Sequence, residues 1–359
     1  MRVLIMAGGT GGHIMPGLAY AEALRQRGAE VHWLGAPQSM EERLVTAARI
    51  GFSPIRVSGV RGKGWRARIA APWMLLRSAL AAMRVILRLR PHLAMGFGGY
   101  VAAPGGLGAA LLRVPLMIHE QNARAGSTNR FLAPLAAQVL AAYPGAFAAR
   151  RAVDIVGNPV RAEILALPGP DDRPAADGPR LRVLILGGSQ GARVLNHLVP
   201  EALALLSADD RPQVRHQGGR TNDEAEQAYA RAGLDVQPES FIADMPGAYA
   251  AADLVICRAG ALTLAEVMAV GLPAICIPLP GAIDDHQTAN ARHLVEAGGG
   301  WLLPERSVTA ADLADLLRGL HHDRAAVHKR ARASRAAARR DTVMQMVERS
   351  FHIAGVGRD

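Results

Sequence analysis

The sequence has few cysteines and few aromatic residues. Only Cys257 and Cys276 occur among its 359 residues, which excludes a disulfide-rich secreted scaffold and a zinc module built on cysteine. Both cysteines stand in short apolar runs, so we expect inert, buried thiols. Aromatic residues make up 4% of the chain, and the core must therefore be built mainly from Ala, Leu, Val and Ile.

Long, strongly apolar segments are also missing. The uncharged stretches 91–112 and 131–149 are interrupted by Gly and Pro, whereas a membrane-spanning helix needs about 20 strongly apolar residues. The apolar run near the N-terminus covers about five residues, which is shorter than a signal-peptide core of roughly 7–15 residues. We therefore expect a protein that stays in the cytoplasm.

Acidic residues are scarce in the first half of the chain. Residues 1–157 contain 19 Arg and Lys but 6 Asp and Glu, and the remaining residues contain 22 basic and 25 acidic ones. Arg outnumbers Lys 39 to 2, and a coding bias would explain that ratio but not the scarcity of acids. A positive half indicates an anionic partner: nucleic acid, acidic lipid headgroups or a phosphorylated substrate.

A weak internal repeat indicates two similar halves. RVLIMAGGTGGH (2–13) and RVLILGGSQGAR (182–193) each combine a buried-type strand, a Gly-rich turn and the start of a helix. Alternating strands and helices predict a doubly wound α/β fold, and 359 residues suffice for two Rossmann-like domains. Further apolar runs, each typical of a strand in a buried parallel sheet, occur at 31–35, 92–98, 115–120, 253–257 and 273–278.

The domain boundary is expected close to the middle of the chain. We assign residues 1–160 to the first domain and 161–339 to the second, with a helix of about 340–359 packing back on the first domain. Residues 167–180 are rich in Pro, Gly and Asp and are typical of a linker. Because ligands of open α/β sheets bind at the carboxyl ends of the strands, we expect the site in a cleft between the domains.

The two Gly-rich turns are candidate phosphate sites. GGTGGH (8–13) and GGSQGA (187–192) follow predicted strands and open predicted helices, where free backbone N–H groups attract anions. Ser189 can add a hydroxyl donor. A dinucleotide fingerprint would require an acidic residue at the end of the second strand, and that residue is absent, as is the Walker pattern.

Polar residues near these turns are candidates for chemistry. His13 lies in the first turn of a predicted helix and either accepts a proton or only bonds backbone groups. HEQN (119–122) ends a buried strand, where this fold places active-site groups. Glu266 can accept hydrogen bonds from two sugar hydroxyls. The run DDH (284–286) offers metal ligands, but no matching cluster supports it, so we expect no metal.

Residues 65–90 predict a basic amphipathic helix. Trp and aliphatic residues are interspersed with Arg in this segment. It contains no Lys, Asp or Glu. Such a helix either lies in an anionic membrane surface or packs its apolar stripe on the sheet. The lack of acids favours the membrane.

The combination of motifs resembles glycosyltransferase family 28, and within it the bacterial N-acetylglucosaminyltransferases that form lipid II for peptidoglycan. The resemblance covers nearly the whole chain. It rests on GGTGGHIMPGLA (8–19), SGVRGKG (58–64), GFGGYVAAPGG (96–106), HEQNARAG (119–126), GNPVR (157–161), GGSQGA (187–192), FIADM (241–245), CRAGALTLAE (257–266) and DDHQTANA (284–291).

The resemblance implies the GT-B fold, two Rossmann-like domains with an interdomain cleft. It implies metal-independent, inverting transfer of GlcNAc, without a cofactor, from UDP-GlcNAc to the C4 hydroxyl of MurNAc in lipid I, the undecaprenyl-pyrophosphoryl MurNAc-pentapeptide. The C-terminal domain would hold the UDP-sugar and the N-terminal domain the lipid. The protein would lie peripherally on the cytoplasmic face of the bacterial inner membrane, serve cell shape and division, and meet the cell-wall or division machinery.

The resemblance also implies roles for single residues. The Ile242 backbone would contact the uracil, Glu266 the ribose, and Arg161 the nucleotide. Asn122 and Gln287 would contact GlcNAc hydroxyls. The donor pyrophosphate would lie against Ser189, Ala261, Leu262 and Thr263.

The acceptor side is implied in the same way. His13 would be the general base, with Glu120 as the second candidate. His286 stands where some family members carry Gln, and we give it no role. The loop facing the donor would consist of Thr10, Gly11 and Gly12. The acceptor pyrophosphate would lie in Gly-rich turns formed by Gly98, Gly99, Gly105 and Gly106.

Other functions stay open on the residues alone. A GT-B transferase acting on diacylglycerol, a UDP-GlcNAc 2-epimerase and a non-catalytic nucleotide-sugar-binding protein would share the fold and the Gly-rich turns. A nucleic-acid binder is disfavoured because the basic half has few aromatic residues for base stacking and no recognised motif.

Overall fold

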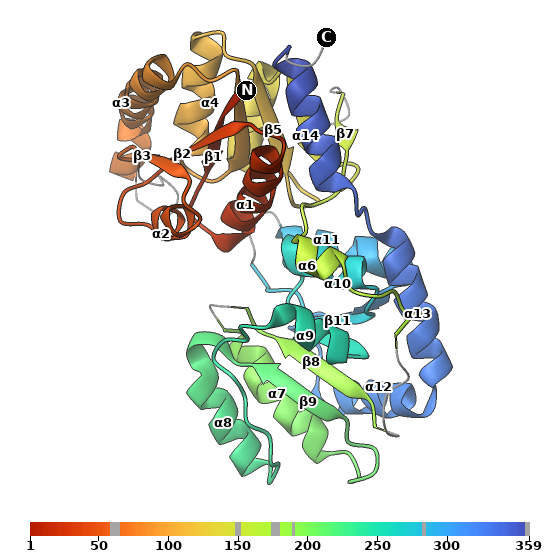
Figure 1. Cartoon of the computed structure of the whole chain (residues 1–359). Helices are drawn as coiled ribbons and strands as arrows, with labels where there is room; N and C mark the ends of the chain where they lie inside the picture. The colour runs from red at the N-terminus through yellow and green to blue at the C-terminus, as the bar shows by residue number, and fades with distance from the viewer. Residues whose placement is uncertain (58–64, 148–151, 174–179, 189–190, 282–284, 356–359) are drawn as a thin grey trace. The chain divides into compact units, whose positions relative to one another are not determined.

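The computed structural model describes residues 1–57, 65–147, 152–173, 180–188, 191–281 and 285–355, with residues 65–72 described by their backbone alone. The predicted turn SGVRGKG (58–64) lies outside the described residues. The chain divides into two units (Figure 1). One consists of Met1–Val160 with Arg339–Asp359, and the other consists of Arg161–Ala338.

The first unit contains a parallel sheet, which has seven strands in the described part of the chain and the order β3-β2-β1-β4-β5-β6-β7. Because β1 lies between β2 and β4, the chain winds outward from β1 in both directions, and the switch point of this sheet lies between β1 and β4. The strands are β1 (Arg2–Ala7), β2 (Glu30–Gly35), β3 (Gly51–Pro54), β4 (Leu93–Gly98), β5 (Leu116–Glu120), β6 (Gln138–Ala141) and β7 (Asp154–Ile155).

Helices cover both faces of this sheet. Alternate residues of β1 belong to different cores: Val3 and Ile5 pack with α1 and α14, whereas Leu4 packs with α3 and α4. A continuous apolar strand is the result of this two-sided burial. The helices are α1 (Gly11–Gln26), α2 (Met40–Ala47), α3 (Trp65–Leu89), α4 (Ala102–Leu111), α5 (Ser127–Leu132), the short η1 (Ala133–Leu135) and α14 (Thr342–Ile353).

The last helix belongs to the first unit. Met346 and Val347 of α14 are fully buried in the same core as Ile14 and Leu24 of α1. The Thr342 hydroxyl donates a hydrogen bond of 2.6 Å to the Val156 carbonyl, which fixes the start of α14. The chain therefore returns to its first unit after it has formed the second.

The second unit repeats the architecture with a parallel sheet of order β12-β11-β10-β8-β9 in the described residues. Here the switch point lies between β8 and β10. The strands are β8 (Arg182–Leu186), β9 (Gln213–Gln217), β10 (Leu254–Cys257), β11 (Ala274–Cys276) and β12 (Gly300–Leu302). The helices are α6 (Ala162–Leu165), α7 (Arg193–Ala204), η2 (Gly219–Thr221), α8 (Asn222–Arg231), α9 (Met245–Ala251), α10 (Ala261–Val270), α11 (His286–Glu296), α12 (Ala310–His322) and α13 (Arg324–Ala337).

The predicted fold class, two doubly wound α/β domains, is confirmed. Cys257 and Cys276 are buried, as expected, and no disulfide joins them. No helix in the described residues has the length and apolar character needed to cross a membrane.

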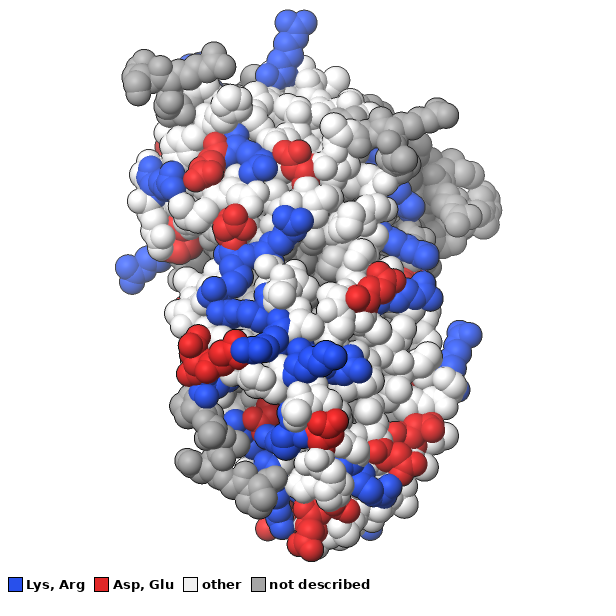
Figure 2. All heavy atoms as spheres, turned by 90° about the vertical axis from the view of Figure 1, so that its right-hand side faces the viewer, with Lys and Arg blue, Asp and Glu red and all other residues white. Residues whose placement is uncertain are grey.

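Charges in the second unit are largely balanced. Figure 2 shows Lys and Arg beside Asp and Glu on the face that carries α13. Arg332 of this helix pairs with Asp171 at 2.6 Å, and Arg324 pairs with Asp253 at 2.9 Å. Such exposed or half-buried pairs contribute little stability each.

Candidate active site

The loops after β1 and β4 meet at the switch point of the first unit. Gly98 and Gly99 have φ angles of +94° and +80°, which favour glycine. A Cβ on Gly99 would overlap the carbonyl oxygen of Gly8. The two loops therefore pack backbone against backbone, which only glycine allows.

His13 lies beside this contact, in the first turn of α1. The helix starts after Thr10, whose carbonyl oxygen accepts a hydrogen bond of 3.0 Å from the His13 backbone N–H. A Cβ on Gly98 would come within 3.2 Å of the His13 ring. Thr10 and Gly12 are exposed and Gly11 is half-buried, so the structure brings Thr10, Gly11, Gly12 and His13 together with Gly98.

The end of β5 contributes the polar HEQN segment to the same edge. Glu120 is buried, and its carboxylate accepts hydrogen bonds from both the backbone N–H and the side-chain amide of Asn122, at 3.0 and 3.2 Å. Its other oxygen accepts from the Gly126 N–H at 3.0 Å and the Asn129 amide at 2.8 Å. The Glu120 carboxylate thus fixes the loop that follows β5 and holds Asn122 in place.

The prediction of a Gly-rich turn at residues 105–106 is wrong. Both glycines lie inside α4, where they are buried. A Cβ on Gly105 would come within 2.5 Å of Met6 Sδ, and one on Gly106 within 2.7 Å of a Leu132 methyl carbon. The absence of a side chain at these glycines lets α4 approach the sheet and its neighbours closely. Side chains of the core occupy the space that a Cβ atom would need.

The Gly-rich turn after β8 lies at the switch point of the second unit. Ser189 lies outside the described residues, but Gly188 and Gly191 flank it with φ angles of +74° and +79°. A Cβ on Gly191 would come within 2.6 Å of the Thr221 hydroxyl. The turn after β8 therefore packs closely against the turn after β9.

Asn196 of α7 holds these two turns together. It is fully buried, and its amide nitrogen lies 3.1 Å from the Gly218 carbonyl and 2.9 Å from both oxygens of Thr221. Sequence reasoning missed this residue. The sequence feature that could have identified it is a single Asn among the apolar residues of a predicted helix.

Glu266 is the most heavily engaged carboxylate of the second unit. It lies on α10, the helix that follows β10 at the switch point. One oxygen accepts hydrogen bonds from Arg161 at 3.0 and 3.1 Å, and the other accepts from the Tyr249 hydroxyl at 3.0 Å. Burial raises the pKa of Glu266, and the interactions with Arg161 and Tyr249 oppose that shift. The structure thus joins two predicted residues and adds Tyr249, which sequence reasoning missed.

The first turn of α10 holds the remaining residues predicted at the pyrophosphate. Gly260 precedes the helix, and Ala261, Leu262 and Thr263 form its start. The positive end of a helix dipole, at such a first turn, favours an anion.

Ile242 and Gln287 lie on neighbouring segments of the second unit. The Ile242 side chain is fully buried in the segment that runs beside the end of β9, where Gly218 donates to the Glu239 carbonyl at 2.9 Å. Gln287, in the first turn of α11, accepts a hydrogen bond of 3.0 Å from the Leu279 backbone N–H.

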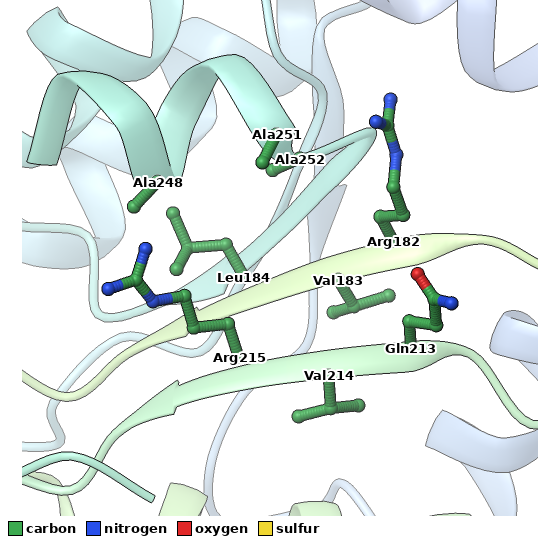
Figure 3. A pocket seen from close by; sticks show the side chains of 9 residues that line it. All are labelled: Arg182, Val183, Leu184, Gln213, Val214, Arg215, Ala248, Ala251 and Ala252. Carbon is green, nitrogen blue, oxygen red and sulfur yellow. The ribbon is translucent and has the colours of Figure 1, made fainter. Parts of the chain in front are cut away.

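A hollow of about 210 Å³ lies elsewhere in the second unit (Figure 3). It lies beside α9 on the face of β8 and β9, with Arg182 and Arg215 near its two ends. Both arginines are paired with carboxylates, Asp253 and Glu239. None of the predicted site residues lines this hollow, so we do not assign the donor to it.

The described residues contain one group of three potential metal ligands, Asp210, His321 and His322. None of them was predicted to belong to the site. Of the predicted run 284–286, Asp284 lies outside the described residues, and Asp285 and His286 begin α11. The candidate site is therefore built from glycine turns, helix starts and hydrogen-bonding side chains.

Two parallel α/β units, each with Gly-rich turns and polar side chains at its switch point, are the architecture of the GT-B fold class. The N-terminal domain of glycosyltransferase family 28 matches residues 3–141, and the C-terminal domain of that family matches residues 182–346. This chain belongs to glycosyltransferase family 28.

Its relatives cover nearly the full chain. The UDP-N-acetylglucosamine–N-acetylmuramyl-(pentapeptide) pyrophosphoryl-undecaprenol N-acetylglucosamine transferase of Marinobacter nauticus is 50% identical over 347 residues, which cover 96% of each chain. The transferase of the same name from Alkalilimnicola ehrlichii is 52% identical over 95% of this chain and 96% of its own. The crystal structure of Acinetobacter baumannii MurG has a TM-score of 0.83 and 40% identity, and covers 97% of this chain and 98% of its own.

Proposed function

We propose that this chain transfers GlcNAc from UDP-GlcNAc to the C4 hydroxyl of MurNAc in lipid I, giving lipid II. The observation that carries the proposal is the identity of about one half, over nearly the whole chain, to transferases named for these substrates. The transfer inverts C1 of the sugar and needs no metal or other cofactor.

The ribose of the donor binds to Glu266 in the second unit. A carboxylate offers about four acceptor positions, and the hydrogen bonds from Arg161 and Tyr249 occupy three of them. A ribose hydroxyl donates to the remaining position, on the oxygen that accepts from Tyr249. Arg161 stays beside the nucleotide, where its charge also favours a phosphate.

The rest of the donor lies along the neighbouring turns. The Ile242 backbone bonds the uracil, and Gln287 and Asn122 bond GlcNAc hydroxyls. The pyrophosphate lies at Ser189 and at the start of α10, formed by Ala261, Leu262 and Thr263. Backbone N–H groups at a helix start stabilise such an anion.

The acceptor belongs to the first unit. Thr10, Gly11 and Gly12 face the reacting sugar, and the turn at Gly98 and Gly99 takes the acceptor pyrophosphate. Support for this turn comes from the two positive φ angles and the packing against Gly8. Among the predicted bases, His13 is favoured over Glu120, because both Glu120 oxygens already accept hydrogen bonds that hold the loop.

The reaction forms one bond and breaks one. The MurNAc C4 oxygen bonds to C1 of GlcNAc as the bond between C1 and the β-phosphate oxygen breaks, and UDP leaves with the bonding electrons. His13 takes the hydroxyl proton, a step typically worth about 10²–10⁴ in rate. The charge that develops on UDP faces backbone N–H groups, which serve in place of a metal.

The enzyme acts peripherally at the cytoplasmic face of the bacterial inner membrane, where it meets lipid I and the cell-wall or division machinery. Support for membrane contact comes from α3. Trp73 and Leu87 of this helix are 63% and 60% exposed, and Leu76 and Leu80 are also exposed. Exposed arginines lie among them, and the combination fits an anionic lipid surface.

A transfer assay tests this function. The chain is incubated with a soluble lipid I analogue and radiolabelled UDP-GlcNAc, with and without EDTA. We expect labelled disaccharide product and one UDP per product, at equal rates in both samples. A label on diacylglycerol, conversion of UDP-GlcNAc to its C2 epimer, binding without UDP release, or loss of activity with EDTA would contradict the proposal.

The same assay tests the general base. His13→Ala should lower kcat about 10²–10⁴-fold and leave the affinity for UDP-GlcNAc unchanged. Wild-type turnover by this variant would remove His13 from the mechanism.

A further inference from the structure

A continuous chain of hydrogen bonds runs from the backbone at Gly157 to the ring of His13. His119 Nε2 lies 2.7 Å from the Gly157 carbonyl oxygen. Gln121 Nε2 lies 3.1 Å from His119 Nδ1, and Gln121 Oε1 lies 3.1 Å from His13 Nδ1. The chain links residues that are far apart in the sequence.

The proton positions follow from the fixed end of the chain. A carbonyl oxygen can only accept a hydrogen bond, so His119 Nε2 carries a proton and donates it to Gly157. Burial lowers the pKa of His119 to about 4, so the ring is neutral near pH 7 and carries only this one proton. His119 Nδ1 must therefore be an acceptor.

The orientation of the Gln121 amide is determined twice. Its nitrogen faces His119 Nδ1, which is an acceptor, and it also lies 3.1 Å from the His119 carbonyl oxygen. Only the –NH₂ end of the amide satisfies both positions. The Gln121 oxygen consequently faces His13, and a neutral His13 must place its own proton on Nδ1 to donate to it.

The hydrogen-bonded side chains of this series are shielded from water and held in place by their neighbours. Gln121 is 1% exposed and His119 is fully buried. The Asn158 amide donates to the Gln121 backbone carbonyl at 3.0 Å, and the Asn129 amide donates to the His119 carbonyl at 3.0 Å. The Gln121 amide has partners at both its nitrogen and its oxygen, and a buried amide with these partners holds one orientation.

We propose that Gln121, oriented by His119 and the Gly157 carbonyl, is a positioning residue that fixes the His13 tautomer with its proton on Nδ1. Nε2 of His13, which has no hydrogen-bond partner among the described residues, is then the atom that takes the proton from the acceptor hydroxyl. This inference rests on the proposed role of His13 as base. It assigns the reacting atom and the residues that select it.

The tautomer is measurable without substrate. ¹⁵N-histidine labelling and long-range NMR correlation report which ring nitrogen of His13 carries the proton at neutral pH. We expect Nδ1–H in the wild type and a mixture of tautomers in Gln121→Met, which keeps the length of the side chain but removes the amide. Gln138→Met, the same substitution on β6, should leave the His13 signal unchanged.

Kinetics give a second readout. Gln121→Met should lower kcat at least about 10-fold, since loss of the correct tautomer disables a base, with the KM for UDP-GlcNAc unchanged. His119→Asn keeps an amide oxygen that can accept from Gln121 and should retain most of the activity, whereas His119→Phe should not. Hydrogen exchange of the sheet amides identifies a variant that fails to fold. In that case the His13 tautomer measured by NMR in the wild type tests the inference by itself.

The outcomes separate this inference from the proposed function. Nε2–H in wild-type His13, or a tautomer that does not respond to Gln121→Met, would overturn the inference even if His13→Ala is inactive. Full activity of His13→Ala would instead overturn the base itself, whatever the tautomer.

Discussion

At the residue scale, Glu266 shows how hydrogen-bond donors offset the burial of a carboxylate. Burial alone raises its pKa, and the hydrogen bonds from Arg161 and Tyr249 favour the ionised form. Arg161 donates twice to one oxygen, and Tyr249 donates once to the other. The oxygen that accepts from Tyr249 therefore keeps a position for the proposed ribose hydroxyl, and the carboxylate would need little reorganisation on binding.

The affinity for UDP should depend on pH through Glu266. Protonation replaces an acceptor by a donor, so affinity should fall as the pH drops through the raised pKa of this group, at a higher pH than for an exposed Glu. Glu266→Gln should bind UDP about 10- to 100-fold more weakly at pH 7.5, as expected for lost hydrogen bonds to a charged group. Isothermal titration calorimetry between pH 5 and 8 measures both effects.

The Gln variant also serves as the control for titration of the UDP phosphate. Its binding should retain only the pH dependence of the ligand. Equal pH slopes for Glu266→Gln and the wild type would contradict the assignment of Glu266 to the ribose.

Single residues were predictable where a local pattern marks them. His13, Glu120 and Glu266 stand beside strand ends and helix starts, and the sequence alone identifies such positions. The roles of Gln121 and Tyr249 were not predictable, because their partners, His13 and Glu266, come from other segments of the chain. Only the packed sheet shows which side chains face one another.

At the scale of elements, α3 presents two different stripes. Ala79, Ala82 and Ile86 are buried against the unit. The opposite stripe exposes Trp73, Leu76, Leu80 and Leu87 together with Arg77, Arg84 and Arg88. The helix thus packs on the sheet, as one interpretation of the sequence predicts. Its opposite side is apolar and basic, and membrane binding by that side stays a prediction.

Reversing charge on the exposed stripe should weaken membrane binding. Arg88 donates to Ser53 at 3.0 Å, so Arg77→Glu with Arg84→Glu is the cleaner change. Each basic residue near an anionic surface contributes about 1 kcal/mol, and the double variant should therefore partition at least about 10-fold more weakly. Sedimentation with vesicles containing anionic lipid at low salt measures the effect.

A matched variant separates local from overall charge. Arg27→Glu with Arg231→Glu changes the net charge equally at exposed positions outside α3 and should keep most of the binding. Equal losses in both double variants would contradict a docking role for α3.

Strands were predictable in proportion to their burial. The central strands β1, β4, β8 and β10 are continuous apolar runs because helices cover both faces. The edge strand β9, QVRHQ, exposes part of its length and mixes polar with apolar residues, so its sequence carries no such signal. The turn that the resemblance implied at Gly105 and Gly106 is part of α4, where close packing against Met6 and Leu132 requires glycine.

At the scale of the whole molecule, the repeat of strand and Gly-rich turn was sufficient to predict two domains of one class. No local pattern in the sequence marks the return of the last helix to the first unit. In the structure that helix completes the core of the first unit through residues such as Met346.

Removal of one buried side chain of α14 should destabilise the first unit. Met346 is fully buried, whereas Met344 on the same helix is 46% exposed. Met346→Ala should lower the free energy of unfolding by about 2–5 kcal/mol, and Met344→Ala by no more than about 0.5 kcal/mol. Hydrogen exchange of the β1 and α1 amides reports the local opening free energy. Equal protection in both variants would contradict the packing of α14 described above.

The path of the chain has a consequence for biosynthesis. Domains generally fold as units while the ribosome is still at work, the N-terminal one first. Here the first unit to be translated lacks part of its interior until the final helix emerges, because Met346 and Val347 belong to the same core as Ile14. The nascent first unit must therefore wait, with an apolar groove uncovered, until the whole second unit has been made.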